Sequence, residues 1–259
     1  MSDHGRFIWY ELITPDAAGA KRFYGDLLGW TPQQMPAMPG APPYTVENLD
    51  GVGVAGVMQR GEAMKEMPPN WTGYVCVDDC DAAAEKVKAL GGSVLQPPLD
   101  IPGVGRFAVI ADPGGAVSAI MKPSPPPGAE PPHRPVRGAP GHAGWRELMA
   151  GDIDKDIAFY QALFGWTETG AHDMGPMGVY HLFGNQDGEV GGMMQRPEQV
   201  PMSCWLYYFE VADINAAAEK VKATGGKVMN GPMEVPDGSW IVQASDPAGA
   251  QFALVTTKS

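Results

Sequence analysis

The chain has 259 residues, enough for one large domain or two of moderate size, because a domain commonly holds about 150 residues. Its 44% hydrophobic and 19% charged residues are close to globular averages, which excludes a disordered chain or a coiled coil. Its 30 acidic against 18 basic residues give a net charge of -12, which repels nucleic-acid phosphates and anionic lipid surfaces. We therefore expect neither nucleic acid nor a membrane as a partner.

The N-terminal residues and the cysteines indicate where the protein resides. Residues 1–6 lack the basic and apolar regions of a signal peptide, and no stretch is long enough to span a bilayer. Cys76, Cys80 and Cys204 form no CxxC pair, and their odd number does not suit a disulfide framework. We predict a cytoplasmic protein with reduced thiols, and the sequence leaves its oligomeric state open.

The first predicted elements are a strand and a helix. Residues 7–13 alternate between apolar and polar side chains, as a half-buried strand does. A helix follows, capped by Thr14 or Asp16. Four apolar residues at helical spacing form its buried face, namely Ala20, Phe23, Tyr24 and Leu27. Short strands are then expected over residues 44–49 and 52–58.

The same order of elements follows in the next part of the chain. An alternating strand is predicted over residues 71–77, and Asp79 begins a second helix. Gly91 and Gly92 end that helix. Further short strands, bounded by glycine and proline, are expected over residues 107–111 and 116–121.

The first half of the chain is repeated in the second half. Four segments return in the same order, Glu11-Leu12 as Glu147-Leu148, Phe23-Tyr24 as Phe159-Tyr160, Ala82 to Ala89 as Ala216 to Ala223, and Asp112-Pro113 as Asp246-Pro247. The residues between the copies are dense in proline, which favours an extended linker that cannot pack a core. We predict two domains, residues 1–122 and 141–259, joined by a linker over residues 123–140.

These motifs resemble the vicinal oxygen chelate superfamily, which includes glyoxalase I, bleomycin-resistance proteins and extradiol dioxygenases. The resemblance is carried by four motifs in order, Trp9-x-Glu11, Thr14-Pro15-Asp16, Phe23-Tyr24 and Leu28-Gly29-Trp30. It covers nearly the whole chain outside the linker. It implies an α+β fold of two tandem domains, each made of paired βαβββ modules that form a half-open eight-stranded barrel.

The resemblance also implies where a divalent metal would be held in each domain. Enzymes of the superfamily use His, Gln or Glu side chains from the first and last strand of each module. Carried over by spacing, these positions fall here at Trp9, Thr72 and Ala119 in one domain and at Trp145, Leu206 and Ala253 in the other. A catalytic metal needs about three protein ligands with an open position. We therefore expect neither the family metal site nor another cofactor.

Two carboxylates are the strongest candidates for a site. Glu11 lies on the same strand face as Trp9, and Glu147 on the same face as Trp145, because side chains repeat every two residues. Each glutamate either is a structural acid satisfied by backbone amides or by an arginine such as Arg106, or orients a substrate and serves as a general base.

Tyrosines and flexible loops are further candidates. Tyr74 and Tyr208 hold equivalent positions and offer an apolar ring with a hydroxyl donor, although either ring could equally fill a core. Two methionine-rich loops, residues 35–40 and 174–178, could form pliable lids or be ordinary hydrophobic loops.

Two function classes remain open. In the first, the protein binds a small apolar or aromatic metabolite without the family metal, through Trp9, Tyr74, Trp145 and Tyr208. In the second, it is a lyase, isomerase or dioxygenase related to glyoxalase I that acts on a carbonyl or vicinal-oxygen substrate at a non-standard site. Glu11 and Glu147 are then the catalytic residues, either as holders of a displaced metal or, without metal, as a base such as Glu11 with Tyr74 as the oxyanion stabiliser. A purely structural role has only the proline-rich linker in its favour.

Overall fold

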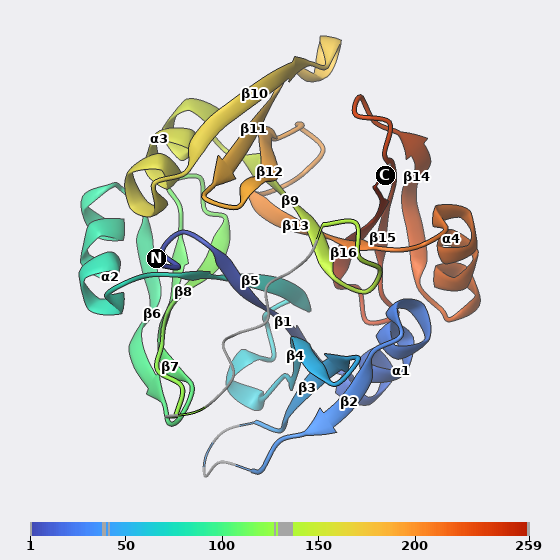
Figure 1. The fold of residues 1–259 in the computed structure, drawn as a ribbon, viewed down its shortest axis with the longest axis horizontal. Coiled ribbons are helices and arrows are strands. Elements are labelled where there is room, and N and C mark those ends of the chain that lie inside the picture. The colour runs from blue at the N-terminus through green and yellow to red at the C-terminus, as the bar shows by residue number, and fades with distance from the viewer. Residues whose placement is uncertain (1, 38–39, 41, 127, 129–136, 258–259) are drawn as a thin grey trace. The chain divides into compact units, whose positions relative to one another are not determined.

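The computed structural model describes residues 2–37, 40, 42–126, 128 and 137–257 (Figure 1). Met38 and Pro39 of the first methionine-rich loop, and residues 127 and 129–136 of the predicted linker, lie outside the described residues.

Two single-turn 3-10 helices occur at Glu62–Met64 and Gly175–Met177. The elements of the first repeat are β1 (Phe7–Thr14), α1 (Ala17–Leu28), β2 (Thr31–Gln34), β3 (Tyr44–Leu49), β4 (Val52–Gln59), β5 (Asn70–Cys76), α2 (Cys80–Ala89), β6 (Ser93–Ile101), β7 (Gly105–Ala111) and β8 (Val117–Pro123). Those of the second repeat are β9 (Ala143–Ala150), α3 (Ile153–Phe164), β10 (Thr167–Asp173), β11 (Val179–Asn185), β12 (Gly188–Gln195), β13 (Cys204–Glu210), α4 (Ile214–Ala223), β14 (Lys227–Glu234), β15 (Trp240–Ser245) and β16 (Gln251–Thr256).

Each repeat forms one mixed sheet of eight strands that is not closed into a barrel. The strand orders are β2-β3-β4-β1-β5-β8-β7-β6 and β10-β11-β12-β9-β13-β16-β15-β14. Within each module the first and last strands are parallel, as β1 and β4 are, and the other pairs are antiparallel, as β3 and β4 are. The predicted α+β fold of paired βαβββ modules is therefore confirmed.

Aspartate side chains begin all four of these helices. The carboxylate of Asp16 accepts the backbone N–H of Gly19 at 2.8 Å, so Asp16 rather than Thr14 caps α1. Asp79, Asp152 and Asp213 cap the other helices in the same way. An aspartate at this position accepts backbone donors that would otherwise have no partner.

Within the described part of the chain, no helix is long and apolar enough to cross a membrane.

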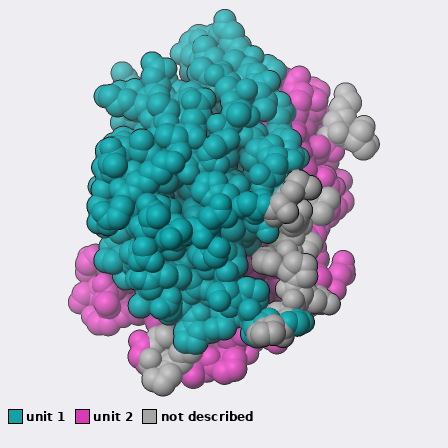
Figure 2. Space-filling view, turned by 60° about the vertical axis from the view of Figure 1, so that its left-hand side comes forward, with its two compact units in different colours: residues 1–8, 72–132, 146–205 teal, residues 9–71, 133–145, 206–259 magenta. Residues whose placement is uncertain are grey.

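The chain groups into two compact units that do not coincide with the two repeats (Figure 2). Unit 1 contains residues 1–8, 72–132 and 146–205, and so joins the second module of the first repeat to the first module of the second. Unit 2 contains residues 9–71, 133–145 and 206–259, and joins the outermost modules of the chain.

A buried tyrosine links the two repeats inside unit 1. The hydroxyl of Tyr160, on α3, donates to Oδ2 of Asp112 at 2.9 Å and accepts Nε1–H of Trp205 at 3.0 Å. Asp112 follows β7 and also accepts the backbone N–H of Ala116 at 2.8 Å. Burial, together with the nearby Asp156 carboxylate, raises the pKa of Asp112 to about 6. The pKa of Tyr160 is raised well above 10 by burial and by Asp112, so its hydroxyl stays neutral and donates.

Unit 2 contains the equivalent group of residues. The hydroxyl of Tyr24, on α1, donates to Asp246 at 3.3 Å and accepts Nε1–H of Trp71 at 2.9 Å. Asp246 comes from the second repeat and Tyr24 from the first, which is the reverse of the assignment in unit 1. In both units, therefore, a tyrosine of one repeat donates to an aspartate of the other.

Glu47 is an exception among the buried charged residues. It lies on β3 with 0% of its surface exposed, and neither carboxylate oxygen has a hydrogen-bond partner. Burial raises its pKa to about 7, and the charge of Lys21 on α1 offsets this only in part. An ionised carboxylate without partners is costly inside a protein, so Glu47 is stable there mainly as the neutral acid.

We expect Tyr160→Phe to lower the free energy of unfolding by about 1–3 kcal/mol, because it leaves Asp112 and the Trp205 indole N–H buried without their partner. Chemical denaturation at pH 7 measures this change. Lys88→Ala, on the exposed surface of α2, is the control and should have little effect. An unchanged stability of Tyr160→Phe would contradict the role given to the hydroxyl.

We expect Glu47→Gln to raise the free energy of unfolding at pH 8 by about 1–3 kcal/mol and to leave it unchanged at pH 4. The pKa of Glu47 is about 7 in the fold and 4.5 ordinarily, so between these values only the folded state holds the proton. The carboxyl therefore lowers stability as pH rises through this window. Denaturation curves at both pH values provide the test, and Glu62→Gln, at an exposed position, should show no such gain.

Candidate functional site

The first strand places Trp9 and Glu11 on one face, as their spacing predicts. Both side chains are half-buried, whereas Tyr10 and Leu12, on the opposite face, are in the core. The ring of Tyr10 packs against the ring of Tyr207 with centroids 5.4 Å apart. The core face of β1 is thus fixed by aromatic packing, and the half-buried face carries the indole and the carboxylate.

Tyr44, on β3, connects these two side chains. Its hydroxyl accepts Nε1–H of Trp9 at 2.8 Å and is hydrogen-bonded to Glu11. Burial is the main cause that raises the pKa of Tyr44 well above 10, and the Glu11 carboxylate raises it further. The phenol therefore stays protonated and donates to the carboxylate.

A glycine makes this contact possible. Gly56 on β4 lies beside Glu11 in the parallel pairing of β1 and β4. A Cβ atom at Gly56 would lie 1.9 Å from the Tyr44 hydroxyl oxygen, so the ring occupies the space of the missing side chain. We call Trp9, Glu11, Tyr44 and Gly56 the first site, and all four lie in unit 2.

The second repeat builds the same arrangement in unit 1. The hydroxyl of Tyr180, on β11, donates to Oε2 of Glu147 at 3.2 Å. Glu147 pairs with Gly192 on β12, where a Cβ atom would lie 2.1 Å from the Tyr180 ring. Nearby, burial and the Glu147 carboxylate raise the pKa of the Cys204 thiol, which leaves it protonated and a poor nucleophile. We call Glu147, Tyr180 and Gly192 the second site.

The other predicted ligand-binding residues make contacts of a different kind. The Arg137 guanidinium lies over the Trp145 ring, 4.8 Å from its centroid, and pairs with Asp237 at 3.0 Å. The hydroxyl of Tyr208 accepts the side-chain amide of Gln243 at 3.2 Å. The Tyr74 ring lies 6.1 Å from that of Phe107. A binding role for Trp145, Tyr74 and Tyr208 stays a prediction.

Sequence reasoning did not find the tyrosines that contact the glutamates. Tyr44 and Tyr180 were not among the predicted site residues. The available signal was the glycines of the neighbouring strands, since an isolated glycine in a strand often marks a close approach of another group. The suggested partner Arg106 instead pairs with Asp81 at 2.7 Å and with Asp100 at 3.1 Å.

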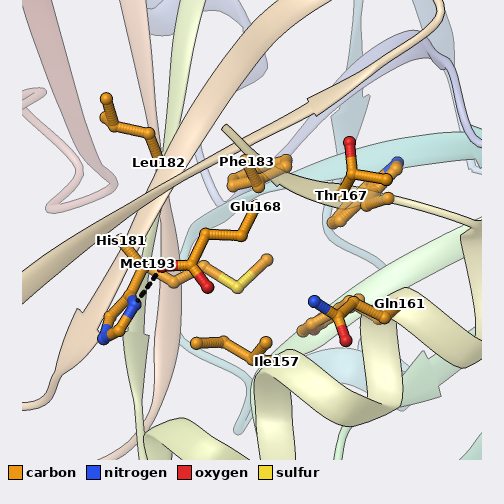
Figure 3. Close-up of a pocket in the computed structure, with 10 residues that line it drawn as sticks. Ile157, Gln161, Thr167, Glu168, His181, Leu182, Phe183 and Met193 are labelled. Atoms are coloured by element: carbon orange, nitrogen blue, oxygen red, sulfur yellow. Dashed lines mark hydrogen bonds and ion pairs between the residues drawn. The ribbon is translucent and has the colours of Figure 1, made fainter. Parts of the chain in front are cut away.

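A shallow crevice lies in unit 1 between α3 and strands β10–β12 (Figure 3). Its volume is about 10 Å³, which is room for about one water molecule and too little for a metabolite. Nδ1 of His181 and Oε1 of Glu168, 2.9 Å apart, are among its lining atoms. Phe183, two residues after His181 on β11, points into the same space, so the crevice is on the opposite face of β11 from Tyr180.

The positions that the resemblance assigns to a metal do not suit one. Ala119, Ala253 and Leu206 are buried and have no donor atom, and the buried Thr72 offers only a hydroxyl. Trp9 and Trp145 offer no donor for a divalent ion either. In the described ranges, no group of three or more His, Cys, Asp or Glu side chains could hold a metal. The donor set present therefore does not fit the family metal.

The chemistry available at each site is hydrogen bonding by a carboxylate and a neutral phenol. A carboxylate accepts a hydroxyl proton strongly, because hydrogen bonds to ionised groups are roughly twice as strong as neutral ones. The phenol can donate to a carbonyl or hydroxyl oxygen. At the first site the half-buried indole of Trp9 adds an aromatic surface.

Comparisons with known proteins agree with this architecture. A family model described as the Glyoxalase/Bleomycin resistance protein/Dioxygenase superfamily matches residues 6–120 and 139–254. The chain is 34% identical over 248 residues to "Putative glyoxylase CFP32" of Mycobacterium tuberculosis, covering 95% of this chain and 93% of that protein. It is 35% identical over 268 residues to "Anthracycline biosynthesis protein DnrV" of Streptomyces peucetius, covering 95% and 91%. The Mn(II)-bound glyoxalase from Novosphingobium aromaticivorans has a similar fold, with a TM-score of 0.66, 16% identity, and coverage of 100% of this chain and 84% of that one.

We expect Gly56→Ala to displace the Tyr44 ring and to lower the free energy of unfolding by about 1–3 kcal/mol, because the added methyl overlaps the hydroxyl. The loss of the Trp9–Tyr44 bond should shift the Trp9 indole N–H resonance in a nitrogen–proton NMR spectrum. Gly61→Ala is the matched control, since its Cβ would meet only Pro42, at 3.6 Å. An unshifted Trp9 resonance in Gly56→Ala would contradict the assigned packing.

Proposed function

The chain belongs to the Glyoxalase/Bleomycin resistance protein/Dioxygenase superfamily, and on that premise we propose that it binds a small hydroxylated aromatic molecule at each of its two sites, without the family metal. The observation that carries this proposal is the glutamate–tyrosine pair, built twice on equivalent strands and each time beside a glycine. A pair that served only to fill space would not need two polar groups, which lie on a half-buried face at Glu11 and in buried surroundings at Glu147.

The chemistry of the pair selects the ligand class. A phenolic or enolic hydroxyl donates to the carboxylate of Glu11, and its oxygen accepts the Tyr44 hydroxyl proton in place of that carboxylate. An aromatic ring attached to that hydroxyl can lie against the Trp9 indole. Anthracyclines, named in the description of the relative from Streptomyces peucetius, are hydroxylated polycyclic aromatic compounds, which supports this class.

The second candidate is an enzyme that uses the same residues. A carboxylate within hydrogen-bond reach of a neutral phenol can remove a proton next to a carbonyl, while the phenol stabilises the oxygen that gains charge. The hydrogen bond between Tyr180 and Glu147 favours this reading. Conversion of the methylglyoxal–glutathione hemithioacetal, lost in the double variant Glu11→Gln and Glu147→Gln, would establish this class in place of simple binding.

We expect isothermal titration with 2-naphthol to show two binding sites per chain. Glu11→Gln should weaken the first site and Glu147→Gln the second by about 10- to 100-fold each, because each change removes a charge-assisted hydrogen bond. The double variant should bind only weakly. The measurement is made at pH 6, where 2-naphthol keeps its proton.

Two controls accompany this titration. 2-Methoxynaphthalene lacks the hydroxyl that donates to the carboxylate, so its binding should be weak and insensitive to both substitutions. Glu62→Gln changes an exposed carboxylate of unit 2 and should leave both affinities as they are. The proposal fails if 2-naphthol binds neither site, or if its affinity is the same in the double variant.

A further inference from the structure

Two equivalent positions differ in polarity between the modules that carry the two sites. Phe183, on β11 of unit 1, lines the crevice between α3 and the sheet, as does Ile157 on α3 (Figure 3). In the repeat, Glu47 stands where Phe183 stands, and Lys21 where Ile157 stands. These two positions are therefore apolar in unit 1, where His181 and Glu168 also line the crevice, and hold a carboxyl and an amine in unit 2.

The surroundings of Glu47 favour its neutral form. In the strand pairing it lies beside Pro32 of β2 and Ala55 of β4, which offer no polar side chain. It is fully buried, and its two oxygens have no hydrogen-bond partner. The raised pKa, about 7, is the consequence of this burial.

The charge that acts on Glu47 comes from α1. On α1, Lys21 is half-buried and its charge acts on Glu47, while Arg22 and Asp26 are exposed. Neither β2 nor β4 contains an ionisable side chain. On β1, Glu11 belongs to the opposite, half-buried face. When Glu47 loses its proton, a negative charge is buried that the charge of Lys21 offsets only in part. Hydration of this charge requires α1 and β3 to separate.

The strand that carries Glu47 also carries the phenol of the first site. Tyr44 and Glu47 lie on opposite faces of β3, three residues apart. The position of Tyr44 depends on close packing of β3 against β4, where the ring fills the space at Gly56. Any outward shift of β3 relative to α1 therefore moves the hydroxyl that must meet both Trp9 and Glu11.

We propose that loss of the Glu47 proton weakens ligand binding at the first site, so that this site is sensitive to pH near neutrality while the second site, which has Phe183 in the equivalent position, is not. This inference rests on the proposed function, since it concerns regulation of the same site. It also makes the two sites unequal, although their glutamate–tyrosine pairs are alike.

The test is isothermal titration with 2-naphthol at pH 6 and pH 8, where the probe is neutral. The Glu147→Gln background isolates the first site, and the Glu11→Gln background isolates the second. At pH 8 the dissociation constant of the first site should rise by about fivefold or more, and that of the second should stay within about twofold. Adding Glu47→Gln to the Glu147→Gln background should abolish the rise, because an amide does not lose a proton in this range.

Glu47→Met provides a second neutral replacement if the amide does not fold well, since methionine adapts to irregular apolar space. The proposal is overturned if the first site binds equally at both pH values, or if the rise persists with Gln or Met at position 47. Persistence would assign the effect to Glu11 or Tyr44 instead.

Amide hydrogen exchange separates a failure of this inference from a failure of the proposed function, because it needs no ligand. After correction for intrinsic rates, residues 45–49 of β3 should exchange faster at pH 8 than at pH 6 by about fivefold or more, relative to the equivalent residues of β11. Glu47→Gln should remove the difference. If 2-naphthol binds neither site, this measurement alone decides the role of Glu47, and equal protection of β3 at both pH values would overturn it.

Discussion

The reciprocal tyrosine–aspartate hydrogen bond is the interaction on which the fold of each unit depends. Tyr160 of the second repeat donates to Asp112 of the first, and Tyr24 of the first donates to Asp246 of the second. A tryptophan indole completes each group. Because these polar atoms are buried, removal of one of them leaves the others without a hydrogen-bond partner and lowers the free energy of unfolding. The bond therefore links a module of one repeat to a module of the other within each compact unit.

A fixed core allows a polar site on the opposite face of the same strands. The core face of β1 is held by aromatic packing, which leaves Glu11 on the half-buried face, beside Gly56. The glycine admits the Tyr44 ring, and the ring brings its hydroxyl to the carboxylate. Around the buried Glu147, Gly192 likewise admits the Tyr180 ring, whose hydroxyl donates to the carboxylate. Duplication has thus preserved a polar pair while the residues at the family's metal positions have no suitable donors.

Much of the fold could be predicted from the sequence, because it depends on local signals. Alternating strands, aspartate caps and the repeated segments gave the modules and their order. The face shared by Trp9 and Glu11 followed from the two-residue period of a strand. The contact with Tyr44 could not be predicted, since it requires knowing two registers. β1 and β4 pair so that Gly56 lies beside Glu11, and β3 and β4 pair so that Tyr44 lies beside Met58. The burial of Glu47 was missed for a similar reason: a glutamate in an alternating strand is normally on the solvent face.

A crystal structure of the chain grown with 2-naphthol would test the central claim most directly. The account predicts a ring with its hydroxyl within hydrogen-bond distance of the Glu11 carboxylate and the Tyr44 hydroxyl, and a second molecule placed in the same way at Glu147 and Tyr180. A structure in which the molecule binds elsewhere, with both glutamate–tyrosine pairs unchanged, would contradict it.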